Sequence, residues 1–366
     1  MTFAGRIAEW MGKGDFSKKI VDWYLVNPRD LPWRKTTDPY RIWLSEVILQ
    51  QTRVAQGLPY YLDFVRNFPN VKVLAKASED KVMRTWQGLG YYSRARNLHA
   101  CAKVVVTKYK GRFPKTYAEL ITLPGIGEYT AAAIASMAFE QPEAVVDGNV
   151  YRVLSRVFGI DEDISTSEGK KVFALKAREL LDVHRPGTYN QAVMEFGALQ
   201  CTPKSPNCVD CIFSSGCFAR KGQIQNLLPV KSKKVKVRTR YFTYFVLKKG
   251  GKVGMKKRAG KDIWGGLYDF YLVEGKRQQR PEIILKSDET LAKIAPYTTL
   301  EFKSESYKHV LTHQHIVARF VILSLSNGFS IKKLSGSLGL GFYSPAEVAS
   351  LPKPALVSRF LSKKTY

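Results

Sequence analysis

The feature of this 366-residue chain that most constrains its fold is a change of hydrophobic pattern near Asn226. Before this point, apolar residues recur about every third or fourth position, as they do in amphipathic helices. After it comes a basic segment with a proline, LLPVKSKKVKVRTR, and then short runs rich in aromatic and β-branched residues, which are typical of strands. The pattern predicts a multi-domain protein, with an all-α domain over 1–225, a basic linker over 226–238 and a smaller α+β domain over 239–366.

Several elements can be placed within this division. YTAAAIASMAF (Tyr129–Phe139) is rich in alanine and predicts a buried helix. NVYRVLSRVFGI (Asn149–Ile160) has a helical period, and Gly159 near its end is a typical stop. In the C-terminal part we expect strands over Tyr241–Leu247, Tyr268–Glu274 and His315–Ser326, with turns at Lys249–Gly251 and Trp264–Gly266.

The chain carries a formal net charge of +27, from 58 Lys and Arg against 31 Asp and Glu. Because such a surplus causes self-repulsion, it favours a polyanionic partner, and nucleic acid is the usual one; a ribosome or a membrane surface is the alternative. No apolar run is long enough to span a bilayer, and the N-terminus lacks the apolar core of a signal peptide. We therefore expect a soluble, cytoplasmic protein that associates with the nucleoid through DNA.

Four of the five cysteines, Cys201, Cys208, Cys211 and Cys217, lie in one segment with six, two and five residues between them. An intracellular protein has little use for a disulfide framework, so the group indicates a metal site. The uneven spacing suits an iron–sulfur cubane bound by one compact loop, whereas zinc more often uses two separated Cys-x2-Cys pairs. Structural zinc and free thiols remain alternatives. Cys101 stands alone and is expected to be an inert core residue.

The segment LPGIGEYTA opens a predicted helix with a Pro-Gly-x-Gly turn. Gly125 and Gly127 leave the backbone uncovered, so that a phosphate can approach the N–H groups and the positive end of the helix. A tight interhelical turn is the simpler explanation of an isolated Gly-x-Gly. Together with the charge and the cysteine loop, the segment favours DNA-backbone binding.

Two acidic residues are candidates for acid–base chemistry. Glu46, in WLSEVILQQT, falls at the border of the apolar stripe of a helix, where a carboxyl group can keep its proton at neutral pH. It could also be an ordinary flanking residue paired with Arg53. Asp147, in VVDGNV, precedes the helix near Asn149 and could act only as its N-cap.

Read together, these segments resemble a known family. LPWR, WLSEVILQQT, GLGYYSRARNLH, LPGIGEYTA, VVDGNV, NQAVMEFGALQC and the four cysteines occur in order over roughly residues 20–220. This combination resembles the helix-hairpin-helix base-excision DNA glycosylases with a 4Fe-4S cluster, and among them the branch that removes adenine. The resemblance implies hydrolysis of the N-glycosidic bond of adenine mispaired with 8-oxoguanine or guanine, by a monomer acting on double-stranded DNA.

The resemblance also implies roles for the acidic residues. Glu46 matches the acid that protonates the leaving adenine, and Asp147 matches the group that stabilises the oxocarbenium-like sugar. Related glycosylase-lyases carry a Schiff-base lysine where this chain has Tyr129, which argues for a monofunctional enzyme. Asn149 is expected to orient Asp147 or a water molecule.

Further positions match residues that contact the bases. Gln51 and Tyr91 match side chains that push into the base stack during base flipping. The walls of the adenine pocket are matched by Arg29, Leu31, Trp33 and Gln191. Ordinary core or surface roles remain alternatives for each of these residues.

The C-terminal part resembles a Nudix-like domain, on the segments MKKR, DIWGGLYDF and HVLTHQHI. It lacks the clustered glutamates that bind Mg²⁺ in Nudix hydrolases, so we expect a recognition module without hydrolase activity. Leu311, Thr312 and His313 match a Phe-Ser-His loop that senses 8-oxoguanine, and Leu311 departs from that pattern by losing an aromatic face. His309, His313 and His315 could bind a metal, but no acidic or cysteine ligand joins them.

Two other functions remain open at this stage. An endonuclease III-type pyrimidine glycosylase-lyase would share the helical motifs, although Tyr129 and the C-terminal domain disfavour it. A non-catalytic iron–sulfur DNA-binding protein would share the charge, the hairpin and the cysteines. Only the pairing of Glu46 with Asp147 separates that protein from the enzyme.

Overall fold

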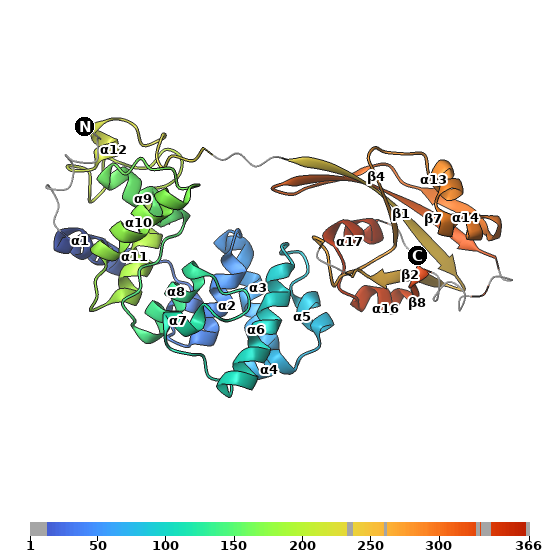
Figure 1. Ribbon diagram of the computed structural model, residues 1–366, viewed down its shortest axis with the longest axis horizontal. Coiled ribbons are helices and arrows are strands. Elements are labelled where there is room, and N and C mark those ends of the chain that lie inside the picture. The colour runs from blue at the N-terminus through green and yellow to red at the C-terminus, as the bar shows by residue number, and fades with distance from the viewer. Residues whose placement is uncertain (1–12, 233–236, 260–261, 327–329, 331–337, 364–366) are drawn as a thin grey trace. The chain divides into compact units, whose positions relative to one another are not determined.

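The computed structural model describes residues 13–232, 237–259, 262–326, 330 and 338–363 (Figure 1). They form two compact units. The helical unit consists of Met1–Lys76 and Asn97–Lys233, and the sheet unit of Ala77–Arg96 and Lys234–Tyr366. Within the described ranges, no helix combines the length and the apolar character that a membrane crossing requires.

The helical unit confirms the predicted all-α character of the N-terminal part. Its helices are α1 (Lys13–Val26), η2 (Pro32–Arg34), α2 (Pro39–Leu49), α3 (Val54–Asn67), α4 (Val71–Lys76), α6 (Ser93–Tyr109, from Asn97 on), α7 (Tyr117–Leu120), α8 (Glu128–Phe139), α9 (Gly148–Phe158), α10 (Ser167–Leu180), α11 (Pro186–Leu199) and α12 (Phe218–Lys221).

Local signals set the ends of the helices around the later site. Asp147 caps the start of α9, and Gly159, at φ 72°, ends it in the left-handed conformation that glycine adopts without strain. The alternative pairing of Glu46 with Arg53 assumed one continuous helix, but α2 ends at Leu49. The reason is a sharp turn in which Gln51 takes a φ of 56°. Arg53 is therefore not on the same helix as Glu46.

The core of the helical unit packs α1, α9, α10 and α11 together. Phe16 of α1 is fully buried, and its ring lies 5.2 Å from that of Phe158 and 5.0 Å from that of Phe213. The ring of Phe196 on α11 lies 5.3 Å from Phe213 in an edge-on arrangement. Because Phe213 belongs to the cysteine segment, this core holds that segment against the helices.

In its described residues, the sheet unit is built on an eight-stranded mixed sheet with the order β3-β2-β1-β7-β5, in which β4 pairs with β1, β6 with β7 and β8 with β2. β1 and β7 run parallel, and the other pairs are antiparallel. The strands are β1 (Arg238–Lys249), β2 (Lys252–Lys257), β3 (Tyr268–Asp269), β4 (Tyr271–Gly275), β5 (Thr298–Lys303), β6 (Tyr307–Val310), β7 (Gln314–Leu325) and β8 (Gly341–Tyr343).

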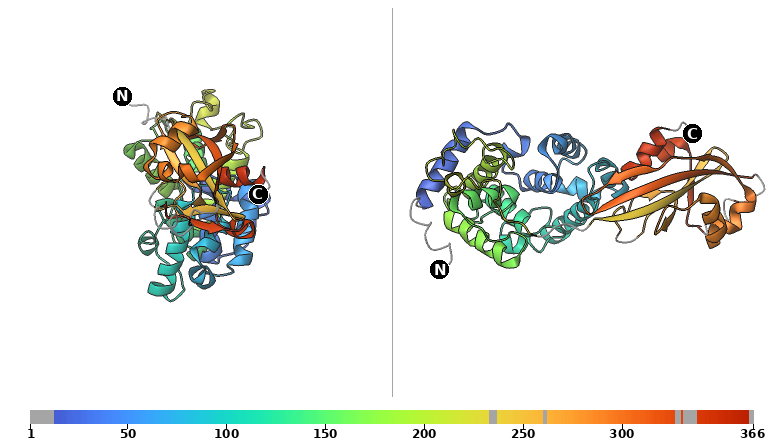
Figure 2. Two further views of the ribbon diagram at one scale, coloured as in Figure 1. Left: turned by 90° about the vertical axis from the view of Figure 1, so that its right-hand side faces the viewer. Right: turned by 90° about the horizontal axis from the view of Figure 1, so that it is seen from above.

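Helices cover both faces of this sheet (Figures 1 and 2). Phe245 of β1 and Val321 of β7 pack with α13 and α14 on one face. Phe320 points to the opposite face, where its ring stacks 4.0 Å from that of Phe360 in α17. The helical elements of the unit are α5 (Glu79–Thr85), the first turn of α6, α13 (Pro281–Ser287), α14 (Glu289–Ile294), η3 (Ala295–Tyr297), α16 (Pro345–Ser350) and α17 (Ala355–Ser362).

The predicted strands are present, with differences at their ends. The expected strand over Tyr268–Glu274 is broken into β3 and β4. The predicted turn after Lys249 is confirmed: Lys249 pairs with Lys252, and Gly250 and Gly251 both take positive φ. In the predicted linker, the Val230 carbonyl accepts a hydrogen bond from the backbone N–H of Ile164 in the helical unit. The last residue of the predicted linker, Arg238, is already the first residue of β1.

Candidate active site

A cavity of about 600 Å³ in the helical unit is lined by residues of η2, α2, α8, α9 and α11. Its volume lies within the range of roughly 300–1,000 Å³ that is typical of small-molecule sites. Eight of the residues predicted from the sequence line it: Arg29, Leu31, Trp33, Glu46, Tyr129, Asp147, Asn149 and Gln191.

Glu46 comes from α2, and its carboxylate is the acceptor of a hydrogen bond from α8. The Tyr129 hydroxyl donates to Glu46 Oε2 at 2.7 Å. Burial raises the pKa of Glu46 to about 7, although the hydrogen bond from Tyr129 acts in the opposite direction. Near neutral pH this carboxyl group can therefore both carry and release a proton.

Asp147 has different surroundings at the start of α9. Its carboxylate accepts hydrogen bonds from the backbone N–H groups of Asn149 and Val150 and from the Asn149 side-chain amide, each at 2.8 Å. Burial raises the pKa of Asp147, while these donors oppose that effect because they stabilise the charged form. Asp147 is both the helix cap and a cavity residue, so its capping of α9 does not exclude a role in the cavity.

The two carboxyl groups thus line one cavity in unlike environments. A protonated group such as Glu46 can donate to a leaving group, and a carboxylate held by several N–H donors, as Asp147 is, can stabilise positive charge that develops beside it. This arrangement suits acid-assisted cleavage of a glycosidic bond.

Arg152 connects the start of α9 to the cysteine segment. Its guanidinium donates to the Cys201 carbonyl at 2.7 Å, to the Gly197 carbonyl at 2.6 Å and to Asn149 Oδ1 at 2.7 Å. Asn149 in turn donates to Asp147. The orientation of Asp147 is therefore coupled through two side chains to the backbone at the first cysteine.

The sequence interpretation missed Glu195, a fully buried carboxylate on α11. Arg34 donates to it at 2.5 and 2.6 Å, and Arg29 donates from its backbone N–H at 3.0 Å and from its side chain. Burial alone would raise the pKa of Glu195, but the hydrogen bonds from Arg34 and Arg29 outweigh it and lower the pKa to about 2. A glutamate in the apolar run VMEFGAL was a signal that a buried ion pair was needed.

The other wall residues are held by packing and by one hydrogen bond. The Tyr24 hydroxyl donates to Gln191 Oε1 at 2.8 Å, which fixes the amide of Gln191 at the cavity. Leu31 and Trp33 are almost fully buried, and the Trp33 ring meets the edge of the Tyr61 ring at 5.0 Å.

The Pro-Gly-x-Gly segment forms the turn before α8, as predicted. Gly125 has a φ of 74°, and a Cβ atom there would lie 2.5 Å from the Asn97 Cβ. Gly127 is the N-cap residue of α8, at φ −98°, and a Cβ there would meet no atom within 4 Å. Both glycines are exposed, so the backbone at the helix N-terminus is open to a ligand.

Gln51 and Tyr91, the two residues predicted to push into the base stack, do not line the first cavity. Gln51 is exposed in the turn after α2. Tyr91, at φ 47°, lies in the sheet unit, where it lines a second cavity of about 470 Å³.

This second cavity also contains the predicted base-sensing residues Leu311, Thr312 and His313. They form the turn between β6 and β7, closed by the Leu311 N–H, which donates to the Gln314 carbonyl at 2.9 Å. Thr312 and His313 are exposed, and the Thr312 hydroxyl lies 2.6 Å from the Tyr91 hydroxyl.

Cys201, Cys208, Cys211 and Cys217 all line one small cavity of about 20 Å³ in the helical unit. N–H donors face two of the sulfurs: Arg156 donates to Cys201 Sγ at 3.5 Å, and the Phe213 backbone to Cys211 Sγ at 3.4 Å. Across the described ranges, no three His, Cys, Asp or Glu side chains are arranged to hold a metal ion, and this includes the histidines of the sheet unit.

Two family models match the chain and agree with the resemblances predicted from the sequence. The model of the HhH-GPD superfamily base excision DNA repair protein matches residues 44–178. The NUDIX domain model matches residues 243–363.

Known proteins are similar over longer stretches. The adenine DNA glycosylase of Buchnera aphidicola subsp. Schizaphis graminum is 33% identical over 325 residues, which cover 88% of this chain and 91% of that protein. The adenine DNA glycosylase of Homo sapiens is 45% identical over 216 residues, covering 56% of this chain and 39% of the human protein. The structure of a thermostable thymine-DNA glycosylase is similar with a TM-score of 0.52 and 28% identity, covering 57% of this chain and 97% of that one.

Proposed function

Because the chain belongs to the adenine DNA glycosylase family, we propose that it hydrolyses the N-glycosidic bond of adenine mispaired with 8-oxoguanine or guanine in duplex DNA. The observation that carries this proposal is the pairing of Glu46 with Asp147 in one cavity of about 600 Å³. A non-catalytic DNA-binding protein has no need of a buried carboxyl group whose pKa is raised to about 7.

In the proposed mechanism, Glu46 protonates the leaving adenine while the Asp147 carboxylate stabilises the positive charge on the sugar. Tyr129 holds Glu46 through its hydroxyl, and Asn149 holds Asp147. A water molecule, deprotonated by the resulting Glu46 carboxylate, completes the hydrolysis. Arg29, Leu31, Trp33 and Gln191 form the walls around the base.

The product is proposed to be an intact abasic strand. A lyase would need an amine to attack the sugar, and the described residues that line the cavity include no lysine. Tyr129 takes the position where the sequence resemblance expects the lysine of a lyase.

The sheet unit is proposed to read the base opposite the adenine. Its cavity of about 470 Å³ brings Tyr91 together with Leu311, Thr312 and His313, and the exposed hydroxyl and imidazole groups there are available to a base edge. Gly125 and Gly127 are proposed to contact the DNA backbone, and Gln51 to enter the base stack. We propose that the chain acts as a monomer, with domains at 1–225 and 239–366 and a linker at 226–238, a division supported by the two family matches.

A 4Fe-4S cluster is proposed at Cys201, Cys208, Cys211 and Cys217. The donor set is that of such a group, because four cysteines line one cavity and N–H groups face two of their sulfurs, as they do around iron–sulfur clusters, although no three of the described thiols converge on a single metal ion. When bound, the cluster would hold the segment rigid. Iron content and the visible absorbance of the purified protein test this assignment, and protein that contains zinc or no metal would contradict it.

A strand-cleavage assay tests the function. Duplexes with adenine opposite 8-oxoguanine, guanine or thymine are incubated with the protein and then treated with hot alkali. We expect cleavage at the adenine opposite 8-oxoguanine and guanine, and only after alkali. Cleavage without alkali, or trapping of a DNA adduct by borohydride, would indicate a lyase, and no cleavage would contradict the proposal.

A further inference from the structure

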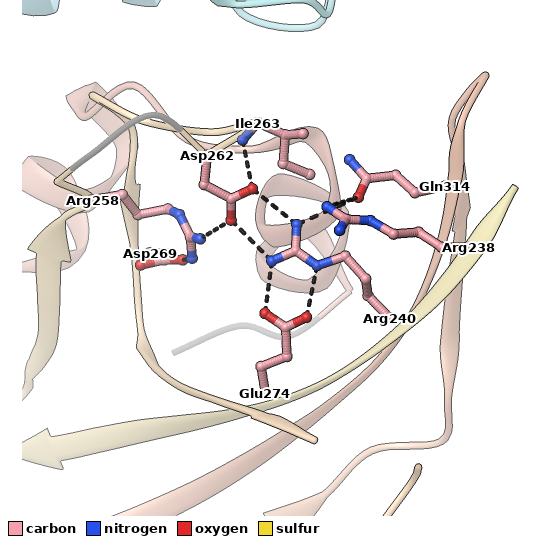
Figure 3. Close-up of polar contacts among 8 residues, drawn as sticks. All are labelled: Arg238, Arg240, Arg258, Asp262, Ile263, Asp269, Glu274 and Gln314. Carbon is pink, nitrogen blue, oxygen red and sulfur yellow. Dashed lines mark hydrogen bonds and ion pairs between the residues drawn. The ribbon is translucent and has the colours of Figure 1, made fainter. Parts of the chain in front are cut away.

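Asp262 is the centre of a network of charged side chains on the sheet unit (Figure 3). Arg240 of β1 makes two hydrogen bonds to its carboxylate, at 2.9 and 3.0 Å, and Arg258 makes another at 2.7 Å. The carboxylate also accepts from the Ile263 backbone N–H at 2.8 Å. The hydrogen bonds from Arg240 help to hold the pKa of Asp262 well down, at about 2, so the group is charged at neutral pH.

This network fixes one end of the turn Asp262–Gly265. The Gly265 N–H donates to the Asp262 carbonyl at 3.0 Å and closes the turn, and the Arg96 guanidinium donates to the Gly265 carbonyl at its other end. Trp264, within the turn, is 3% exposed, and its ring lies 5.8 Å from the imidazole of His309.

The turn forms a wall of the 470 Å³ cavity. Asp262, Ile263 and Trp264 line it, together with His309 and the hairpin turn 311–313. Arg240 and Glu274 do not line it. The Arg240 side chain is nonetheless only 10% exposed, and its second carboxylate partner is Glu274, at 2.6 and 2.7 Å.

We propose that Arg240 is a positioning residue for recognition of the base opposite the adenine. Through Asp262 it holds in place the turn Asp262–Gly265, which contains Trp264 and forms one wall of the cavity, and so it sets which opposite base the cavity prefers. This inference rests on the proposed function. Two parallel hydrogen bonds from a planar guanidinium fix the orientation of a carboxylate as well as its position. An error of about 1 Å in such a wall is enough to weaken recognition of a base edge.

The two partners of Arg240 allow a matched comparison. Asp262→Asn breaks the bidentate pair on the cavity side, and Glu274→Gln breaks the corresponding pair on the side away from the cavity. In each variant the other carboxylate still neutralises Arg240, so neither leaves a buried charge without a partner.

The experiment measures the affinity of the wild type and both variants for two duplexes. Each duplex contains 2′-fluoro-2′-deoxyadenosine, whose glycosidic bond resists cleavage, opposite either 8-oxoguanine or guanine. The readout is the ratio of the two dissociation constants, because a general loss of folding or DNA binding cancels in it. We expect Asp262→Asn to reduce the ratio of the two dissociation constants, and so the preference for 8-oxoguanine, about tenfold. This is the size of effect that the loss of one charge-assisted hydrogen bond produces. Glu274→Gln should keep the wild-type ratio.

Other results overturn the inference. It fails if Asp262→Asn keeps the full preference, or if both variants lose it equally, since the network would then have only a general structural role. It also fails if the wild type binds both duplexes equally. If Asp262→Asn does not fold, Arg96→Lys, which loosens the other end of the same turn, must lower the ratio instead. Excision from ordinary adenine duplexes is measured in parallel: a wild type that removes no adenine overturns the proposed function as well.

Discussion

Glu46 has a pKa near 7 chiefly because it is buried, and the charge of Asp147 acts in the same direction. If the protonated form is the catalytic one, the single-turnover rate of base removal should fall as pH rises through about 7, roughly tenfold per pH unit above it. Tyr129→Phe removes a hydrogen bond that lowers this pKa, so the fall should move to higher pH. The measurement is the pH–rate profile of both proteins.

Glu46→Gln is the matched control for that profile. It keeps the shape of the side chain but carries no transferable proton, so it should bind the mispair and not cut it. A flat profile in the wild type, a shift to lower pH in Tyr129→Phe, or full activity in Glu46→Gln would remove Glu46 from the proposed role.

Asp147→Asn separates the two roles of the residue at position 147. Asparagine is as good an N-cap as aspartate, so the free energy of unfolding should fall by no more than about 2 kcal/mol. Loss of the negative charge should lower the rate of base removal at least about a hundredfold. Denaturant unfolding and single-turnover kinetics measure the two effects, and a variant with nearly full activity would leave Asp147 as a cap alone.

At the scale of single residues, sequence analysis identified those residues that stand in a recognisable local motif. Glu46 and Asp147 were singled out from such motifs, and both line the cavity of the helical unit. Glu195 was missed because its burial depends on Arg29 and Arg34, which lie more than a hundred residues earlier in the chain. A pattern within one helix cannot show which distant cations will neutralise a carboxylate.

At the scale of elements, the turn before α8 offers a paired test. Gly125→Ala places a Cβ atom 2.5 Å from the Asn97 Cβ at a φ of 74°, so it should destabilise the fold by about 1–3 kcal/mol. Gly127→Ala meets no atom within 4 Å at an ordinary φ, so its stability should stay within about 0.5 kcal/mol of wild type.

The same pair tests the phosphate contact. If DNA phosphate approaches the backbone at Gly127, the alanine variant should bind an undamaged duplex more weakly although it is folded normally. Denaturant unfolding and binding titrations at one salt concentration separate the two effects. Unchanged DNA affinity of Gly127→Ala would contradict the proposed phosphate contact. Unchanged stability of Gly125→Ala would contradict the need for glycine at that turn.

Elements with a strong local pattern were predicted, and those that depend on partners were not. The predictions for α8 and α9 were confirmed within one or two residues, because alanine content and apolar period are local properties. β8 was not predicted, since its three residues become a strand only by pairing with β2. α14 was also missed, although Asp288 ahead of it is a typical N-cap and accepts from the Thr290 and Leu291 N–H groups.

At the scale of the whole molecule, the net charge of +27 makes a prediction that is independent of base recognition. Binding to undamaged duplex should weaken steeply with salt, at least about a thousandfold between roughly 50 and 200 mM, if six or more phosphates are contacted. The measurement is the dissociation constant against salt concentration. Affinity that does not change with salt would mean that the charge serves another partner.

The division of the chain into a helical and a sheet-containing part was predictable because the hydrophobic period changes once, near Asn226. The assignment of Ala77–Arg96 to the sheet unit was not. It depends on contacts such as that between the Tyr91 and Thr312 hydroxyls, which join residues 221 positions apart. Sequence period reports local geometry and carries no information on such pairings.

The most direct test of the central claim is the intact mass of the adenine-containing strand after incubation with the protein, without alkali. The substrate is a duplex with one adenine opposite 8-oxoguanine. We predict that this strand stays whole and changes only by the loss of one adenine and the gain of one hydroxyl group. A strand of unchanged mass, or one broken into two fragments, would contradict the account.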